Sequence, residues 1–229
     1  MLIAMTDNTM IETALTAPPL PPDKAPPRNV RFVLRVTILL LMIVLIIPVG
    51  VVAIGSGLGL IALPYQMFEL AGRAPLLFPV HMVSSALVLL LAPAVVLARR
   101  HPELHRPLGR LLGAFVVIGG LTAIPVAIMS HSPLTSRLGF FVQSLVWLYL
   151  LAAALVAIRQ REIARHARLM VAMLAVTTGA VWFRVITGTA IALNLPFEPA
   201  YAFAAWAGWM LPLAIVMGNS GVTSILLER

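Results

Sequence analysis

Long apolar stretches without charge, separated by short arginine-rich segments, set the pattern of this 229-residue chain. No acidic residue, lysine or arginine lies between Arg35 and Glu69, and none lies in Ala74–Ala98. A membrane-spanning helix needs about 20 mainly apolar residues, so both windows are long enough to cross a bilayer. The pattern predicts an all-α, polytopic membrane bundle of about six transmembrane helices. The expected helices are Arg31–Ile54, Pro79–Ala98, Leu111–Ser130, Leu138–Ile158, Arg168–Leu193 and Pro199–Met217.

Proline and glycine positions refine these expectations. The glycine-containing segment Gly55–Pro64 is expected to connect the first two helices along the outer interface. Pro79 suits a first helical position, where a missing N–H costs nothing. Pro125 is expected to kink the third helix. The stretch Val222–Leu227 is too short to span and is expected to continue the last helix along the inner surface.

The N-terminal residues have a different composition. Six prolines fall within residues 18–27, beside Asp23 and Lys24. Such a segment is typical of an extended, poorly ordered tail, and it lacks the pattern of a secretory signal. The expected organisation is a disordered, Pro-rich cytoplasmic tail over residues 1–30 and a single transmembrane helical domain over residues 31–229.

Composition excludes several classes of protein. Hydrophobic residues make up 61% of the chain and charged residues 10%, against about 25% charged in a typical soluble domain. This excludes a soluble enzyme, a disordered protein and a collagen-like fibre. Cysteine is absent, which excludes disulfides, thiolate metal sites, cysteine nucleophiles and Cys-ligated iron–sulfur clusters.

The basic residues predict an orientation. On the six-helix map, 13 of the 16 basic residues fall on one face. The positive-inside rule makes that face cytoplasmic, with both termini beside it, in a bacterial inner membrane. The net charge of +8 therefore indicates contact with the bilayer and its anionic lipids, and not with nucleic acid. An alternative for the inner arginines is a pocket for a phosphorylated or carboxylated ligand.

Four histidines fall near helix ends, in two pairs. His81 and His131 are expected near the outer surface, and His105 and His166 near the inner surface. A b-type haem needs no cysteine and is held by two neutral imidazoles that face each other. The pairs are therefore candidate haem ligands, with His81 and His131 the better candidates for the iron. The alternative is that these histidines are solvated and bind nothing.

Arg184 is the single residue that points most directly to a function. It lies about 24 Å along the fifth expected helix from its inner end, at 1.5 Å per residue. A charge within the bilayer core is costly, so it is often functional. Arg184 is a candidate to bind a carboxylate, a quinone oxygen or a haem propionate. The alternatives are that it snorkels to outer headgroups or pairs with Glu69 or Glu198.

Other catalytic patterns are missing. The sequence has no GxSxG, no HExxH and no acidic residue inside an expected helix. No catalytic residue is assigned, and an enzyme with its own nucleophile is the least supported class. A faint parallel repeat joins RRHPELHRPLGR with RQREIARHARLM, although inner hairpin turns of unrelated origin also look alike.

A few short motifs carry a family resemblance. They are His81 at the opening of a helix, HRPLGR at His105–Arg110, the pair Gly119–Gly120, REIARHARLM at Arg161–Met170, and Arg184. With these, the chain resembles a bacterial family of predicted multi-pass membrane proteins, domain of unknown function 2306. The resemblance implies a helical membrane protein and no particular activity. The histidines at both faces also look loosely similar to two-haem cytochrome b membrane proteins.

Two functional hypotheses follow. The first is a membrane electron-transfer protein that binds b-type haem or quinone between the second, third and fifth expected helices. The second is a non-catalytic membrane protein, either a small-molecule transporter or an accessory subunit bound to an unidentified protein partner. The first predicts a Soret band in the purified protein, and the second predicts no chromophore.

Overall fold

The computed structural model describes residues 28–63 and 65–218, and each regular element within them is a helix. Residue contacts divide the chain into two units, residues 1–34 and 35–229. The described part of the first unit consists of the opening residues of α2 (Arg28–Gly57). Most of the expected N-terminal tail, residues 1–27, and the stretch Val222–Leu227 lie outside the described residues.

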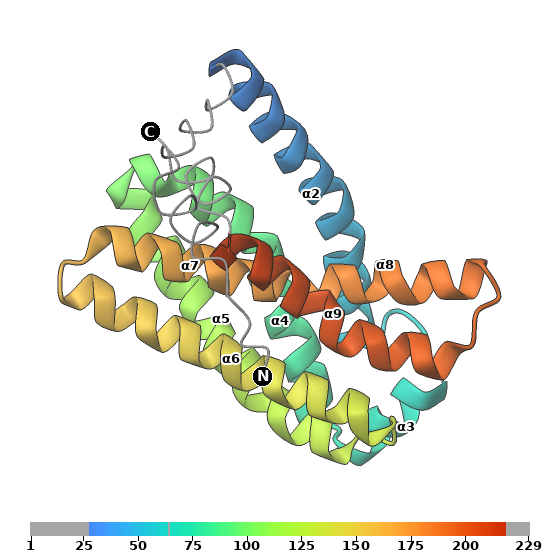
Figure 1. Ribbon diagram of the computed structural model, residues 1–229. Coiled ribbons are helices and arrows are strands. Elements are labelled where there is room, and N and C mark those ends of the chain that lie inside the picture. The colour runs from blue at the N-terminus through green and yellow to red at the C-terminus, as the bar shows by residue number, and fades with distance from the viewer. Residues whose placement is uncertain (1–27, 64, 219–229) are drawn as a thin grey trace, which may run out of the picture. The chain divides into compact units, whose positions relative to one another are not determined.

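Helices account for almost all of the described chain (Figure 1). After α2 come α3 (Tyr65–Arg73), α4 (Leu77–Leu97) with a 3-10 turn (Ala98–Arg100), α5 (Pro102–Met129), α6 (Leu134–Arg159), α7 (Ile163–Thr177), α8 (Gly179–Ala192) and α9 (Phe197–Gly218). Among the described residues, five segments are long and apolar enough to cross a membrane. They are Leu77–Arg100, Pro102–Met129, Leu134–Arg159, Ile163–Ala192 and Phe197–Gly218.

These segments confirm the prediction of an all-α, polytopic membrane bundle. Five of the six expected helices meet the length and composition that a crossing requires. The first expected helix corresponds to α2, of which the shorter stretch Ile43–Gly57 is apolar in the searched residues. A crossing by α2 therefore stays a prediction.

Most helices begin or end a few residues from the expected boundaries, and the largest differences have local reasons. Helix α5 begins at Pro102, nine residues before the expected start at Leu111, because proline is well suited to the first helical turn. The segment HRPLGR is therefore helical, although its charge indicated a loop. Helix α3 was not expected at all, since its nine residues are too few to give a clear periodic signal.

The fifth expected helix is divided at Thr178 into α7 and α8. Thr177 and Thr178 donate their hydroxyls to the carbonyls of Met173 (3.0 Å) and Ala175 (2.7 Å). Such bonds compete with the helical backbone pattern and bend helices. The division lies in the segment that approaches the candidate site, so α8 holds Arg184 on a separate short helix.

The helices pack as hairpins around an apolar interior. In Figure 1, α4 runs beside α5, α6 beside α7, and α8 beside α9. Leu112 and Val116 of α5 and Met173 and Val176 of α7 are fully enclosed. Many large apolar side chains remain exposed, among them Leu97, Tyr149, Ile163 and Met217. So much exposed apolar surface is what a bilayer covers.

Small residues bring the helix backbones close together. A Cβ on Gly139 of α6 would lie 2.8 Å from the carbonyl oxygen of Ala205 in α9. A Cβ on Gly208 of α9 would lie 3.2 Å from the carbonyl oxygen of Gly179 in α8. Close approach at small residues is the usual way that helices associate in a membrane. These contacts fix α9 and α8 against the bundle, next to the candidate site.

Candidate functional site

His81, on α4, is held by the backbone of α5. Its Nδ1 lies 3.0 Å from the carbonyl oxygen of Gly119 and 3.4 Å from the hydroxyl of Ser85. The approach depends on Gly119, because a Cβ there would lie 2.9 Å from the Ser85 hydroxyl oxygen. The missing side chain therefore makes room for the contact between the ring and the carbonyl.

The partner atom determines the tautomer of the ring. A carbonyl oxygen only accepts hydrogen bonds, so Nδ1 of His81 must carry the proton that it donates to Gly119. In the neutral ring, Nε2 then holds a lone pair. Histidines that bind a ligand or a metal through Nε2 are commonly oriented by this kind of Nδ1 bond.

Arg184 lies on α8, and Val181, three residues earlier, belongs to the same buried apolar cluster as Leu89 of α4, the helix that carries His81. The guanidinium is half-buried and donates from one terminal nitrogen to the carbonyl oxygen of Ala180, at 2.8 Å. Because an arginine has five N–H donors, a single backbone bond leaves most of them available.

No carboxylate pairs with Arg184 within the described part of the chain. The acidic partners suggested by the sequence were Glu69 and Glu198. The described ion pairs of Glu69 include one with His131, and none joins either glutamate to Arg184. The guanidinium is thus a partly buried cation without a counter-ion among these residues, which is an arrangement suited to an anionic or strongly accepting oxygen.

An aromatic cluster includes Phe183, the residue before Arg184 in α8. Phe183 of α8 packs edge-to-face on Tyr201 of α9, with ring centroids 4.9 Å apart. Phe140 of α6 lies 5.3 Å from Phe183 and 6.1 Å from Tyr201. This cluster, Phe140–Phe183–Tyr201, joins three helices and gives the polar pair an apolar neighbour.

His81 and Arg184 both lie nearer to the helix ends that are remote from the arginine-rich turns. His81 follows the start of α4 by four residues, or about 6 Å, and Arg184 precedes the end of α8 by eight residues, or about 12 Å. Both helix ends lie opposite the arginine-rich turns.

His131 lies elsewhere, in the turn between α5 and α6. Its Nε2 bonds to the guanidinium of Arg73, and its Nδ1 lies 3.7 Å from a carboxylate oxygen of Glu69. His81 is level with Gly119, which is ten helical residues, or about 15 Å, from the end of α5 at Met129. Two imidazoles on one metal ion lie only about 4 Å apart, so the structure does not bring this pair together.

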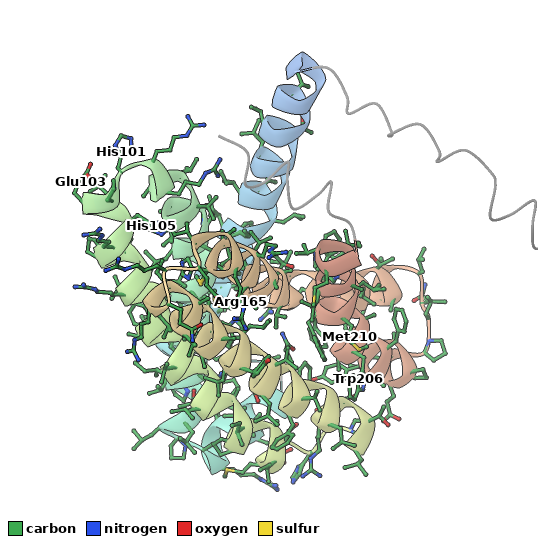
Figure 2. All side chains as sticks on the ribbon, turned by 60° about the vertical axis from the view of Figure 1, so that its left-hand side comes forward. His101, Glu103, His105, Arg165, Trp206 and Met210 are labelled. Carbon is green, nitrogen blue, oxygen red and sulfur yellow. The ribbon has the colours of Figure 1, made fainter. Side chains whose placement is uncertain are left out.

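His105 and His166 have matching positions in two hairpins. Nδ1 of His105 lies 3.1 Å from the carbonyl oxygen of Val95 in α4, and Nδ1 of His166 lies 2.9 Å from that of Ala154 in α6. Figure 2 shows His105 with His101 and Glu103 at the start of α5. Each histidine thus joins its helix to the preceding one, as a repeated hairpin would require.

A haem shared by His105 and His166 stays a prediction without geometric support. No hydrogen bond or ring contact joins the two histidines, and the bundle beyond them is filled by enclosed side chains such as Leu112 and Met173. The described residues also contain no cluster of three or more His, Cys, Asp or Glu that would hold a metal ion.

Sequence reasoning missed two parts of this site. Gly119 was noted only as part of a glycine pair, and its role as the acceptor for His81 depends on the packing of α5 against α4. Tyr201 was not linked to the site, because its ring contact with Phe183 depends on the packing of α9 against α8.

The fold and the site define the class of this protein as a polytopic helical membrane protein with a polar pair inside the bundle. The chain belongs to the family of predicted membrane proteins DUF2306, whose profile matches residues 78–217. The match includes the helices from α4 to α9 that build the site, and confirms the resemblance drawn from short motifs. No curated protein and no solved structure matches the chain.

Proposed function

We propose that this protein is a membrane electron-transfer protein that binds a quinone at His81 and Arg184, between α4, α5 and α8. The proposal is carried by two polar groups inside the bundle: an imidazole oriented by the backbone of α5, and a half-buried guanidinium without a paired carboxylate in the described chain. Their helices, α4 and α8, share a buried apolar cluster that contains Leu89 and Val181. The helices α4, α5 and α8 correspond to the second, third and fifth helices expected from the sequence.

The chemistry of the pair suits the oxygens of a quinone. Arg184 donates hydrogen bonds, and charge-assisted bonds to oxygen are stronger than neutral ones. The imidazole of His81 supplies a second polar atom on the neighbouring helix. A quinone carries oxygens on opposite sides of one ring, so it can contact groups from two helices at once.

The surroundings suit the rest of such a ligand. The ring cluster Phe140–Phe183–Tyr201 lies beside Arg184 and offers edges and faces to a flat ring. The exposed apolar side chains of the helices face the part of the membrane in which a quinone tail dissolves. A ligand that arrives from the bilayer would therefore meet apolar surface first and the polar pair within the bundle.

Direct binding in nanodiscs tests the proposal. We expect a radiolabelled short-chain benzoquinone to bind the wild-type protein saturably, and Arg184→Leu to weaken binding at least about tenfold, the loss of a charge-assisted hydrogen bond. Arg184→Lys keeps the charge and should lose less. Arg73→Leu is the matched control, since it removes another arginine that lies on α3 and contacts His131.

Two results would overturn this function. One is the absence of saturable quinone binding by folded wild-type protein. The other is equal binding by Arg184→Leu and Arg73→Leu. If a long-chain carboxylate binds in place of the quinone and depends on Arg184, the small-molecule transporter is the better hypothesis.

An optical spectrum separates quinone from haem. Protein purified from haem-replete cells is recorded oxidised and then reduced with dithionite. The quinone site gives no Soret band, whereas a b-type haem on His81 gives one that disappears in His81→Ala. A Soret band that disappears in His81→Ala would mean that the site binds haem and not quinone.

The proposal also includes an orientation of the protein in the membrane. The turns that follow α4 and α6 contain Arg99, Arg100, Arg159 and Arg161, and we place them at the cytoplasmic side of a bacterial inner membrane. There they would contact anionic headgroups, each worth about 1 kcal/mol near the surface. The quinone site then opens toward the outer leaflet.

A further inference from the structure

We infer that the chain binds one anionic phospholipid in a groove between α5 and α6. One acyl chain of the lipid lies in the groove, and Arg110 and Arg159 hold its phosphate. The two helices pack side by side as a hairpin (Figure 1). This lipid site goes beyond the proposed function and does not depend on quinone binding.

The groove is apolar and faces the membrane. It has a volume of about 320 Å³, and six apolar side chains line it: Val117 and Leu121 of α5, and Leu148, Leu151, Ala152 and Leu155 of α6. Four of the six are exposed, so the groove opens on the surface that lipid covers. A lining without polar side chains offers nothing to a polar ligand, and it suits a hydrocarbon chain.

Two arginines continue the faces of this groove toward the arginine-rich turns. Arg110 precedes Val117 of α5 by seven residues, and Arg159 follows Ala152 of α6 by seven residues. Seven residues are close to two helical turns, so each arginine lies on the same face as the lining residue of its helix. Both arginines are exposed. The groove therefore has a basic end and an apolar body.

The two arginines also approach the same depth. Gly113 of α5 lies beside Leu151 of α6, since a Cβ on Gly113 would lie 3.7 Å from the Cδ1 of Leu151. From that level, Arg110 lies about 4.5 Å and Arg159 about 12 Å nearer the arginine-rich turns. Helical side chains lean toward the N-terminus of their own helix, so Arg159 leans back toward the groove and Arg110 leans away from it. In two antiparallel helices, these directions bring the guanidinium groups closer in depth.

Both guanidinium groups are available to a ligand. Within the described part of the chain, neither makes a hydrogen bond or an ion pair. The acidic residues of the neighbouring turns have other partners. Glu103 lies 3.5 Å from His101 (Figure 2), and Glu162 lies 2.8 Å from Arg165. The basic end of the groove is therefore suited to an external anion.

A hydrocarbon body and a basic end together match an anionic phospholipid. Guanidinium groups bind phosphate oxygens through paired N–H donors. Basic pockets between transmembrane helices are known sites for anionic headgroups. A second copy of the chain fits less well, because its net charge of +8 would bring more positive charge to this surface.

Native mass spectrometry of the delipidated protein tests the site. The protein is titrated with phosphatidylglycerol and, separately, with phosphatidylethanolamine of the same acyl chains. We expect the first phosphatidylglycerol to bind at least about tenfold more tightly, because its headgroup carries a net negative charge. The double variant Arg110→Gln, Arg159→Gln should bind it about thirtyfold more weakly, through the loss of two basic contacts. Equal binding of the two lipids by the wild-type protein would overturn the inference.

A second pair of arginines gives the matched control. Arg100→Gln with Arg168→Gln removes the same charge from the 3-10 turn and from α7, neither of which lines the groove. This variant should keep the tightly bound phosphatidylglycerol. Equal weakening in both double variants would mean that the lipid is attracted by the basic turns in general, and the specific site would be wrong.

Filling the groove tests its apolar part without a change of charge. Ala152 is exposed, so Ala152→Phe puts a ring into the groove and leaves the core intact. We expect phosphatidylglycerol to bind at least about fivefold more weakly, because its chain loses apolar contact. Val156→Phe, at an exposed position outside the lining, should change nothing. Unchanged binding by Ala152→Phe would overturn the inference. So would a lipid-free dimer of the wild-type protein that this substitution abolishes.

Discussion

Trp147 of α6 donates its indole N–H to the hydroxyl of Thr177 at the end of α7, over 2.9 Å and out of contact with solvent. The same ring lies against Gly119, where a Cβ would come within 3.2 Å of its Cζ3 atom. One side chain therefore connects the end of α7, where α8 begins, with the glycine that holds His81. The candidate site depends on this connection as well as on its own polar groups.

Replacing this tryptophan tests the connection. We expect Trp147→Phe to lower the free energy of unfolding by about 1 kcal/mol, because a buried hydroxyl loses its donor while most of the ring remains. Denaturant unfolding in detergent measures the change. The control is Trp206→Phe, which removes an exposed bond to the carbonyl of Thr135. Equal effects of the two variants would contradict the special role of Trp147.

Gly119 is predicted to tolerate no side chain. In Gly119→Ala the new Cβ would lie 2.9 Å from the hydroxyl of Ser85 and 3.2 Å from that of Ser84. The side chains of Ser85 and Trp147 would have to shift, at a cost of about 1–3 kcal/mol. We also expect quinone binding to weaken, since the carbonyl that orients His81 would move.

The same helix supplies the control for that prediction. A Cβ at Gly109 of α5 would meet nothing within 4 Å, so Gly109→Ala should leave binding unchanged. Its stability should stay equal or rise by up to about 1 kcal/mol, because alanine favours a helix over glycine. Thermal unfolding and quinone binding of both variants give the comparison. A destabilised Gly109→Ala beside an unaffected Gly119→Ala would refute the close-packing argument.

We predict that His131 stabilises α3 and takes no part in ligand binding. His131→Ala removes the contacts to Arg73 and Glu69, which are partly exposed and worth less than about 1 kcal/mol. We expect faster hydrogen exchange in α3 (Tyr65–Arg73), unchanged global stability and unchanged quinone binding. Loss of binding in this variant would revive a joint role for His81 and His131.

The absence of cysteine makes the topology directly measurable. Single cysteines at exposed positions are labelled with a membrane-impermeant maleimide in spheroplasts. We expect Asn194→Cys, in the turn between α8 and α9, to react before lysis. His101→Cys and Gln160→Cys, in the turns after α4 and α6, should react only after lysis. Labelling of His101 and Gln160 on opposite sides would break the even number of crossings between them.

The sequence by itself determined the class of fold. Length and uncharged windows predicted the helices that cross the membrane, because a chain in lipid must satisfy its backbone groups internally and the helix does so within one segment. It also marked Arg184, since a charge in an apolar segment is costly and therefore rare. Boundaries were less certain at α5, where the charge of HRPLGR concealed a helical segment.

Only the tertiary structure decided which residues meet. Helical periodicity states which side chains share a face, but not which helix that face contacts. The choice of Gly119 as the partner of His81, and the ring contact of Tyr201 with Phe183, follow from how closely small residues let α5 and α9 pack. In the sequence, His81 and His131 both fall near helix ends on the same expected side. The packing of the helices gives them different partners, Gly119 for His81 and Arg73 for His131.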